Sequence, residues 1–413
     1  GPQAQLRRTL TLAPGESQTV LTLLGFDSSR EVLDKAISAI LHDGAALRLH
    51  LARQYWEQVL GAMRFDVPDP ALALMLNRYL PYQVRAARLF ARAGFYQAGG
   101  AYGFRDQLQD MLALMYTEPL AVRAHLLRCA AHQFVEGDVQ HWWHEPLLGV
   151  RTRISDDKLF LPYVTAAYVQ ITGDSGVLHE NAPYLRAPTL KQNEHERIDS
   201  PEVTQEQEPL WAHCLRAVRH CAFGPHGLLL MGGGDWNDGM NRVGGEKGES
   251  VWLSMFYCEA VRKLLPYSDE QTRNELAESR HRVLAALERH AWDGKWYLRA
   301  WYHDGAPLGS AQNAECRIDA LPQSWAVLGG LNRENCALAM DELWRQLYDP
   351  ALGLLRLFTP PFDVAEKPGY IAGYVPGVRE NGGQYTHAVP WAIAALHQLG
   401  QDDRAWQLAL SIL

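Results

Sequence analysis

A series of apolar stretches with helical spacing, separated by long polar connections, most constrains what this chain can fold into. The stretches lie near residues 44–62, 107–116, 118–135, 157–172, 208–222, 250–266, 270–291, 320–329, 332–348, 386–399 and 401–412. The long connections, at 94–106, 136–156, 223–249, 292–319 and 349–385, are rich in Gly, Trp, Asp and His. Alternating short and long connections are typical of helical hairpins arranged in a ring, with the long loops on one face. The sequence therefore predicts a mainly α, helical-barrel protein whose site lies in the loop-lined cleft.

The N-terminal region follows a different pattern. Residues 6–24 alternate partly between apolar and polar around Pro14 and Gly15, which predicts a β-hairpin. Because an isolated two-stranded hairpin is only marginally stable, we expect these strands to be the remnant of a larger β-domain. Ser28 with Glu31 predicts a helix-capping box, and Asp69-Pro70 predicts the start of a helical run to residue 93.

Charge and hydropathy exclude two classes of partner. The net charge is −8 and no long basic run is present, so we do not expect nucleic-acid binding. The apolar runs are interrupted well before the ~20 residues that span a bilayer, so this segment is not expected to insert into a membrane. The 13 Trp and 17 Tyr residues mildly favour a carbohydrate ligand, because aromatic rings stack on the apolar faces of sugars.

The 6 cysteines are scattered without a CxxC spacing, which favours buried free thiols and a reducing compartment. We therefore expect a cytoplasmic location, and tethering to a membrane through other regions stays open. His141 and His144 have a ligand-like spacing, but no HExxH helix or Cys partner completes a zinc site. No metal and no cofactor are predicted.

The segment 232–252 carries the clearest chemistry. Asp235 and Asp238 flank Trp236 in a Gly-rich loop that leads to a helix near Glu249 and Ser250. Glycosidic cleavage needs a carboxylic acid to protonate the leaving oxygen. A Trp beside that acid would hold the sugar and raise the pKa of the acid by excluding water. The alternative interpretation, Asp residues that cap turns or bind calcium, is weakened because their spacing fits no EF-hand.

Three further segments are rich in site-type residues. In 96–110, Arg105-Asp106 at a helix entrance could bind sugar hydroxyls or merely form a local ion pair. The segment 136–163 concentrates His, Trp, Arg and Asp, with loop packing as the alternative. In 376–391, Arg379, Glu380 and His387 surround a Gly-Gly turn and could bind an oxyanion, although His387 could equally be an ordinary buried histidine.

Together these segments resemble the family 94 glycoside phosphorylases, which include the cellobiose and chitobiose enzymes. The motifs occur in family order over residues 90–395, and the likeness is strongest to the phosphorylase-like C-terminal region of cyclic β-1,2-glucan synthases and to β-1,2-oligoglucan phosphorylases. They are YQAGGAYGFRDQLQD, EGDVQHWWH, GVRTRISDD, GDWNDGMNRVG, GESVW, NAECRID with QSW, and PGVRENGGQYTH.

The resemblance implies roles on the donor-sugar side. Asp238, the second Asp of the DWND motif, matches the family's general acid. Trp236, Arg105 and Asp106 match residues of the donor-sugar subsite. Asp235, the first Asp of the DWND motif, is assigned to substrate binding.

On the acceptor and phosphate side, Arg379 and Glu380 match positions that touch the acceptor, although some relatives carry Lys in place of Arg379. His387 matches a phosphate-binding histidine, and Arg153 is assigned to the same ligand. The family also has a later Thr-Gly loop that contacts phosphate, and no similar segment occurs up to Leu413. We therefore expect a fragment, or a chain whose remaining parts are not included.

The implied reaction is a single inverting displacement. Phosphate attacks the anomeric carbon of a β-linked gluco-oligosaccharide while Asp238 protonates the leaving oxygen and α-glucose 1-phosphate forms. The resemblance favours β-1,2-glucan as the substrate. Inorganic phosphate is a co-substrate. Two alternatives stay open: an inverting hydrolase in which Glu380 or Asp106 activates water, and a non-catalytic glucan-binding or length-control module of a larger synthase.

The expected domains are a remnant of an N-terminal β-sandwich (1–26), a helical linker (27–68) and the catalytic barrel (69–413). The barrel is of the (α/α)6 type, and its completeness at the C-terminus stays open. The expected partners are a β-glucan oligosaccharide and phosphate. A homodimer and a place in a larger synthase chain are both compatible with this sequence.

Overall fold

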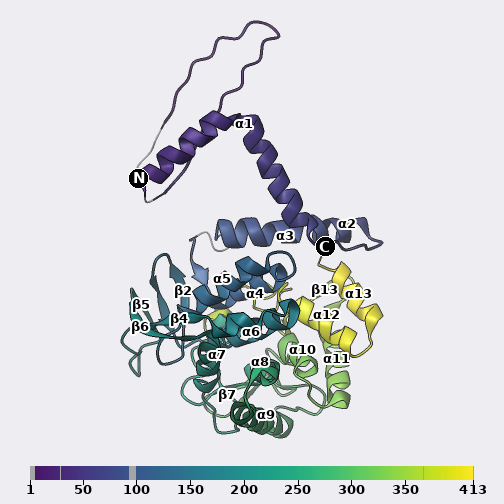
Figure 1. Ribbon diagram of the computed structural model, residues 1–413. Coiled ribbons are helices and arrows are strands. Elements are labelled where there is room, and N and C mark those ends of the chain that lie inside the picture. Colours follow the sequence, from purple (N-terminus) through teal and green to yellow (C-terminus); the bar gives the residue numbers. More distant parts are fainter. Residues whose placement is uncertain (1–4, 28, 93–98, 366, 413) are drawn as a thin grey trace. The chain divides into compact units, whose positions relative to one another are not determined.

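Each predicted apolar stretch forms a helix in the computed structural model, which describes residues 5–27, 29–92, 99–365 and 367–412. The prediction of a mainly α protein is therefore confirmed. The chain divides into two compact units, residues 1–62 and 63–413, which are described separately. Figure 1 labels the helices and strands along the chain.

The first unit consists of extended chain and one kinked helix, α1 (Arg30–Gly61). Ser29 caps this helix by accepting a hydrogen bond from the amide of Val32, and the predicted cap Ser28 lies outside the described residues. The helix bends at Gly44, whose φ of 78° is left-handed and is tolerated because glycine has no Cβ.

The strands predicted for residues 6–24 do not form, so the hairpin prediction is wrong for this segment. The turn itself is present: the amide of Glu16 donates to the carbonyl of Ala13 at 3.0 Å, and Gly15 has a φ of 83°. The side chains on both sides of the turn are exposed. A two-stranded hairpin without a packed layer gains too little burial to hold its strands together.

The second unit begins with the helical run predicted from Asp69-Pro70. The Asp69 carboxylate accepts a hydrogen bond from the amide of Leu72 at 2.8 Å, and Pro70 occupies the first turn. The run ends at Phe90, whereas residue 93, its predicted end, lies outside the described residues. Its segments are α2 (Pro70–Leu74), π-helical turns at Met75–Tyr79 and Val84–Phe90, and α3 (Leu80–Gln83) between them.

Five inner helices then follow one another, each packing against the next, and five outer helices cover them. The inner helices are α4 (Phe104–Leu114), α6 (Asp157–Thr172), α8 (Val251–Leu264), α10 (Ala320–Leu328) and α12 (Ala388–Gln398). The outer helices are α5 (Pro119–Ala130), α7 (Leu210–Arg219), α9 (Glu270–His290), α11 (Arg333–Leu347) and α13 (Asp402–Leu410). This order is that of successive helical hairpins (Figure 1).

Sequence determines which helices are inner and which are outer. Helix α8 is apolar around almost its whole circumference, and nearly all of its residues are buried. Helix α9 is largely charged and buries only a narrow stripe that includes Leu276, Val283 and Leu287. The inner helices also carry polar residues at their starts: Arg105 on α4, Asp157 on α6, and His387 at the N-cap of α12. These starts therefore converge on one face and build the site.

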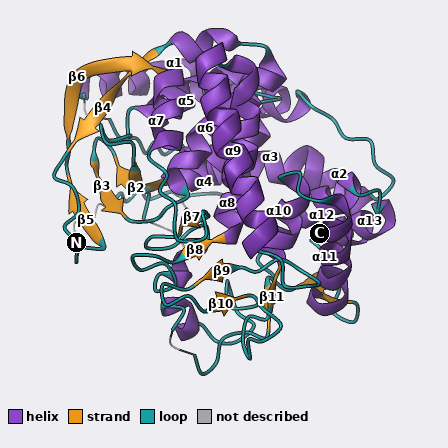
Figure 2. Cartoon of the chain, turned by 90° about the horizontal axis from the view of Figure 1, so that it is seen from below, coloured by secondary structure: helices purple, strands orange, loops and turns teal. Residues whose placement is uncertain are grey.

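In the described part of the chain, short strands lie beside the helices in two four-stranded sheets and three two-stranded ladders (Figure 2). The sheets have the orders β1-β2-β3-β5 and β10-β9-β8-β7, and all of their pairings are antiparallel. The strands are β1 (Tyr102–Gly103), β2 (Gln140–His144), β3 (Leu148–Thr152), β4 (Asn181–Arg186), β5 (Glu196–Asp199), β6 (Glu202–Pro209), β7 (Leu229–Leu230), β8 (Glu249–Ser250), β9 (Ala300–Trp301), β10 (Pro307–Leu308), β11 (Ile318–Asp319), β12 (Tyr348–Asp349), β13 (Leu354–Leu355) and β14 (Phe358–Thr359).

All six cysteines are free thiols, and five of them are buried, as predicted. Within the described ranges, every helix is too short or too polar to cross a lipid bilayer.

Candidate functional site

A cavity of about 460 Å³ opens where the starts of the inner helices meet the long loops. Seven of the nine residues predicted for the site line it, together with residues that the sequence did not single out. The lining consists of Arg88, Gly103, Phe104, Arg105, Asp106, His141, Trp142, Asp157, Trp236, Asp238, Tyr370, Tyr374, Arg379, Glu380, Tyr385 and His387.

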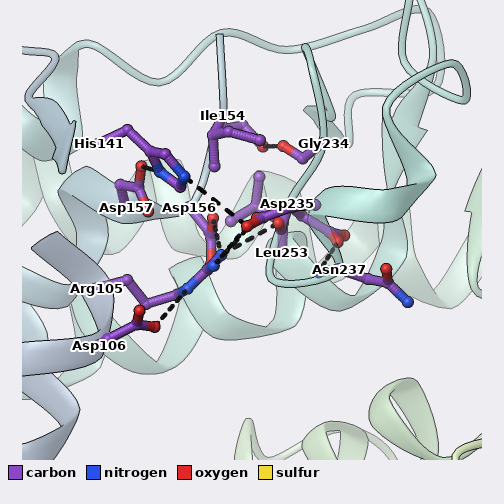
Figure 3. Close-up of polar contacts among 12 residues, drawn as sticks. Arg105, Asp106, His141, Ile154, Asp156, Asp157, Gly234, Asp235, Asn237 and Leu253 are labelled. Atoms are coloured by element: carbon purple, nitrogen blue, oxygen red, sulfur yellow. Dashed lines mark hydrogen bonds and ion pairs between the residues drawn. The ribbon is translucent and has the colours of Figure 1, made fainter. Parts of the chain in front are cut away.

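Arg105 is the central cation of this cavity. Its guanidinium donates to both carboxylate oxygens of Asp156 at 3.2 Å and to both oxygens of Asp238 at 3.0 and 3.2 Å. It also donates to the backbone carbonyl of Asp235 at 3.2 Å (Figure 3). These partners hold the planar guanidinium in one orientation, so that α4 and the 232–238 loop are fixed to each other through one side chain.

Asp106 follows Arg105 on the first turn of α4. Its carboxylate lies against Gly103, where a Cβ atom would come within 2.5 Å of its Oδ2, so the close approach requires glycine at 103. Burial raises the pKa of Asp106, but the positive charges of Arg105 and Arg88 outweigh this effect, and the pKa falls below its usual value. Asp106 is therefore an anion that can accept hydrogen bonds from sugar hydroxyls.

Asp238 presents a carboxyl group to the cavity with 32% of its side chain exposed. Burial raises the pKa of Asp238 above its ordinary value, although the charges of Arg105 and His141 act against the shift. A raised pKa keeps more of the group protonated at neutral pH, as a general acid requires. Asp238 is the first residue of a short 3₁₀ turn (Asp238–Met240).

His141 and Asp157 form a second charged pair in the cavity. The Nδ1 of His141 lies 2.7 Å from the Oδ2 of Asp157 (Figure 3). Its Nε2 lies 3.8 Å from the Oδ2 of Asp238. Burial lowers the pKa of His141, but Asp157 outweighs it and raises the pKa to about 9. The imidazole is therefore protonated at neutral pH, and Asp238 lies between two cations.

Asp235, which the sequence assigned to substrate binding, is buried and is not among the residues that line the cavity. Its carboxylate is fully buried and forms a two-pronged ion pair with Arg299 at 2.6 and 2.7 Å. It also accepts from the Ser250 hydroxyl at 2.6 Å and from the amide of Asn237 at 3.1 Å. Asp235 therefore fixes the loop to the protein interior through these contacts, while Trp236 and Asp238 of the same loop line the cavity.

Trp236 lines the cavity with an almost buried ring. The ring makes edge contacts with Tyr385, His387 and Trp391, with centroids 5.3 to 6.1 Å apart. Trp391 in turn contacts Trp252 and Trp325 of α8 and α10. The wall of the cavity is thus continuous with the aromatic core between the inner helices.

Arg379, Glu380 and His387 also line the cavity, and His387 lies next to the Trp236 ring. Arg379 Nε lies 3.2 Å from Glu380 Oε2, and its guanidinium lies over the Tyr374 ring at 4.6 Å. Arg379 has a left-handed φ of 54°, a conformation that is uncommon for a residue with a side chain. Burial lowers the pKa of His387 below its ordinary value, although the charge of Asp106 acts against this shift, and a neutral imidazole can donate one hydrogen bond to an anion.

Arg153 lies elsewhere, so the structure does not bring this predicted phosphate ligand to the cavity of Asp238. Its guanidinium donates to the backbone carbonyls of Glu194, Leu190 and Lys191 at 2.7 to 3.4 Å. Arg153 follows β3 directly and lines a second cavity.

Several cavity residues were not predicted. His141 and Asp157 lie in the segment 136–163, whose density of His and Asp was the available signal. Arg88, which pairs with Asp110 at 2.9 Å, lies in an ordinary helical pattern that gives no such signal. The aromatic residues Tyr370 and Tyr385 come from loops whose course only the fold defines.

The glycosyl hydrolase 94 superfamily, catalytic domain, matches residues 55–412 of the chain. The cyclic β-(1,2)-glucan synthase NdvB of Rhizobium meliloti is 42% identical over 98% of this chain and 15% of its own length. The solabiose phosphorylase of Paenibacillus borealis is 31% identical over 99% of this chain and 51% of its own length. The N,N'-diacetylchitobiose phosphorylase of Vibrio furnissii is 25% identical over 97% of this chain and 52% of its own length. The chain thus spans about half of the phosphorylases and a smaller part of the synthase.

A solved structure of a rhamnosidase from Klebsiella oxytoca with rhamnose bound shares the helical fold. It superposes with a TM-score of 0.52 over 82% of this chain and 54% of the rhamnosidase, at 14% identity. This likeness concerns the fold alone.

Proposed function

Since the chain belongs to the glycosyl hydrolase 94 superfamily, we propose that its cavity supports phosphorolysis of a β-linked gluco-oligosaccharide with inversion at the anomeric carbon. Asp238 carries the proposal. It is a partly exposed carboxyl group whose pKa is raised by burial, and it lies in a cavity that also holds cations and a neutral histidine.

In the proposed step, a phosphate oxygen forms a bond to the anomeric carbon while the bond from that carbon to the bridging oxygen breaks. Asp238 gives its proton to the bridging oxygen, so the leaving sugar departs as an alcohol. The products are α-glucose 1-phosphate and an oligosaccharide shortened by one unit. Because phosphate is already an anionic nucleophile, the step requires no carboxylate base.

The other cavity residues divide the remaining work. Arg105 and Asp106, fixed at the start of α4, would hold the hydroxyl groups of the donor sugar against Trp236. His387 and Arg379, which line the same cavity, would hold phosphate for attack from the face opposite the leaving oxygen. A β-1,2-glucan is the favoured substrate, since the synthase relative is named for that linkage.

The test is incubation of the protein with a panel of β-linked gluco-oligosaccharides, with and without phosphate, followed by assay of glucose 1-phosphate and its anomeric form by NMR. We expect α-glucose 1-phosphate only when phosphate is present. Release of reducing sugar without phosphate would support the hydrolase instead. Binding of the glucan with no turnover would support a non-catalytic module.

The Asp238→Asn variant should lose phosphorolysis by about 10²–10⁴-fold while it still binds the glucan, because the amide cannot supply the proton. The matched control is Asp304→Asn, which changes an exposed carboxylate paired with Lys367 outside the cavity. Turnover of Asp238→Asn at the rate of this control would contradict the assignment.

His387→Ala should raise the KM for phosphate roughly 10- to 100-fold with a smaller effect on the KM for the glucan, since one hydrogen bond to a charged ligand is lost. An unchanged KM for phosphate would remove His387 from the phosphate site.

A further inference from the structure

A second cavity, of about 780 Å³, lies behind the Gly-rich loop that carries Trp236 and Asp238. Its walls come from the end of β3 and the start of α6, from the loop 189–195, from the end of α7, and from Gly232 and Gly233. Its lining contains no Phe, Trp or Tyr within the described part of the chain. A glucan chain, which binds by stacking on aromatic rings, is therefore a poor match for this cavity.

The most informative residue of this cavity is Lys158 on the first turn of α6. It is only 8% exposed, and its ammonium donates to the backbone carbonyl of Ser155 at 2.8 Å. Among the described residues, no carboxylate oxygen lies within 4.0 Å of this ammonium. An ammonium has three donors, and a buried charge is usually paired. Two donors of Lys158 are thus left without a protein partner in a polar cavity.

The carboxylates that line the cavity are already engaged or exposed. Arg151 binds Glu136 at 2.9 Å and Asp138 at 2.6 Å, so these two groups are not available to Lys158. Glu246 is exposed and accepts a hydrogen bond from Gln192 at 3.5 Å. None of these three supplies the missing counter-charge.

Two further donors line the same cavity. Arg153 uses Nε and Nη2 for backbone carbonyls, while no hydrogen bond within the described ranges involves its Nη1. His220, at the end of α7, has no side-chain hydrogen bond within those ranges either. Burial and, next in size, the charge of Lys158 lower the pKa of His220, so Lys158 and His220 are close enough to interact electrostatically. A cation, an arginine N–H and an imidazole that share one cavity are typical of sites for phosphoryl oxygens.

We propose that this second cavity binds a phosphoryl oxyanion, either free phosphate or the phosphate of a sugar phosphate, through Lys158, Arg153 and His220. The site is separate from the phosphate position beside Asp238. Arg153, which the sequence assigned to phosphate, would thus serve this ligand in a different cavity.

The two cavities share structural elements. The amide and the hydroxyl of Ser155 both donate to the carbonyl of Gly234, at 3.0 and 2.9 Å, and the amide of Gly233 donates to the carbonyl of Arg153 at 2.8 Å. Figure 3 shows Ile154 and Gly234 side by side at this junction, with Asp156 and Asp157 beyond it. An anion bound to Lys158 and Arg153 would therefore stabilise the chain segment on which the loop of Asp238 rests.

The test measures equilibrium binding of inorganic phosphate and of glucose 1-phosphate to the whole chain by calorimetry, in a His387→Ala background that weakens the first phosphate position. We expect binding that Lys158→Gln weakens roughly tenfold or more and that Lys158→Arg largely retains. The matched control is Lys263→Gln, because Lys263 lies near Glu259 at 3.7 Å, outside this cavity. Tighter binding of glucose 1-phosphate than of phosphate would identify a sugar phosphate as the ligand, and equal binding would identify free phosphate.

Equal affinities of the Lys158→Gln variant and its parent for both ligands, or no binding by the parent, would overturn the proposal. If Lys158→Gln does not fold, His220→Gln replaces it, since His220 lies at the end of α7 and is not part of the hydrophobic core. It should weaken binding in the same direction, and unchanged binding would again overturn the proposal. Because the measurement needs no turnover, its outcome is independent of whether phosphorolysis occurs at Asp238.

Discussion

The buried pair of Asp235 and Arg299 should be far more important for stability than any surface ion pair of this chain. Both side chains have no exposed area, and Asp235 accepts hydrogen bonds from Arg299, Ser250 and the amide of Asn237. The Asp235→Asn variant keeps the shape of the side chain at position 235 but loses its negative charge. Arg299 stays buried, and its remaining carboxylate partner is Asp319, 3.3 Å from the Arg299 Nε. Removing one partner of a buried pair costs about 3–5 kcal/mol, and the remaining carboxylate places the expected loss near the lower end.

The assay is urea unfolding followed by circular dichroism, with Asp304→Asn as the control. The Asp304–Lys367 pair has a similar length, 2.7 Å, but both side chains are about half exposed, so its loss should cost about 0–1 kcal/mol. A loss for Asp235→Asn no larger than that of the control would refute the reasoning. The double variant Asp235→Asn/Arg299→Met should be less destabilised than the sum of the single variants, because it leaves no unpaired charge.

The pair also predicts a pH dependence. Burial raises the pKa of Asp235, but Arg299 and the hydrogen bonds outweigh it, and the folded-state pKa lies below the unfolded value. The stabilisation is therefore present above the unfolded pKa of about 4 and is lost as the pH falls through the folded pKa. The difference in stability between wild type and Asp235→Asn should shrink on acidification, and a constant difference would contradict this origin.

Two further predictions concern the cavity. Gly103→Ala should raise the KM for the donor sugar, because the new Cβ would lie 2.5 Å from the Asp106 carboxylate. The control Gly61→Ala should leave this KM unchanged, because the space around its new Cβ is open. Equal KM values for the two variants would contradict the importance of the contact between residue 103 and Asp106. In the wild type, activity should fall near pH 9 as His141 loses its proton. Asp157→Asn removes the main cause of the raised pKa of His141, so this fall should move to lower pH. An unchanged pH profile of activity would show that the protonation of His141 does not affect the reaction.

The helices and the main motifs could be predicted because their signals are local. Apolar residues at helical spacing, the cap at Asp69 and the Gly-rich loop before α8 each depend on residues close together in the chain. The strands β4 and β6 were not predicted, since Glu202–Pro209 is largely polar and pairs with a segment some twenty residues earlier. The prediction of a hairpin at 6–24 was wrong for the opposite reason: its residues alternate between apolar and polar as in a strand, but the strands would have no layer to pack against.

The sequence by itself determined that Asp238, Arg105, Trp236 and His387 belong to one site, because their motifs occur together and in order. Only the tertiary structure decided which of two carboxylates three residues apart is buried against Arg299 and which faces the cavity. It also decided that Arg153 belongs to a second cavity. The physical reason is that a side chain's role depends on its direction and on partners far away in the chain, such as the contact between Arg105 and Asp238 across 133 positions.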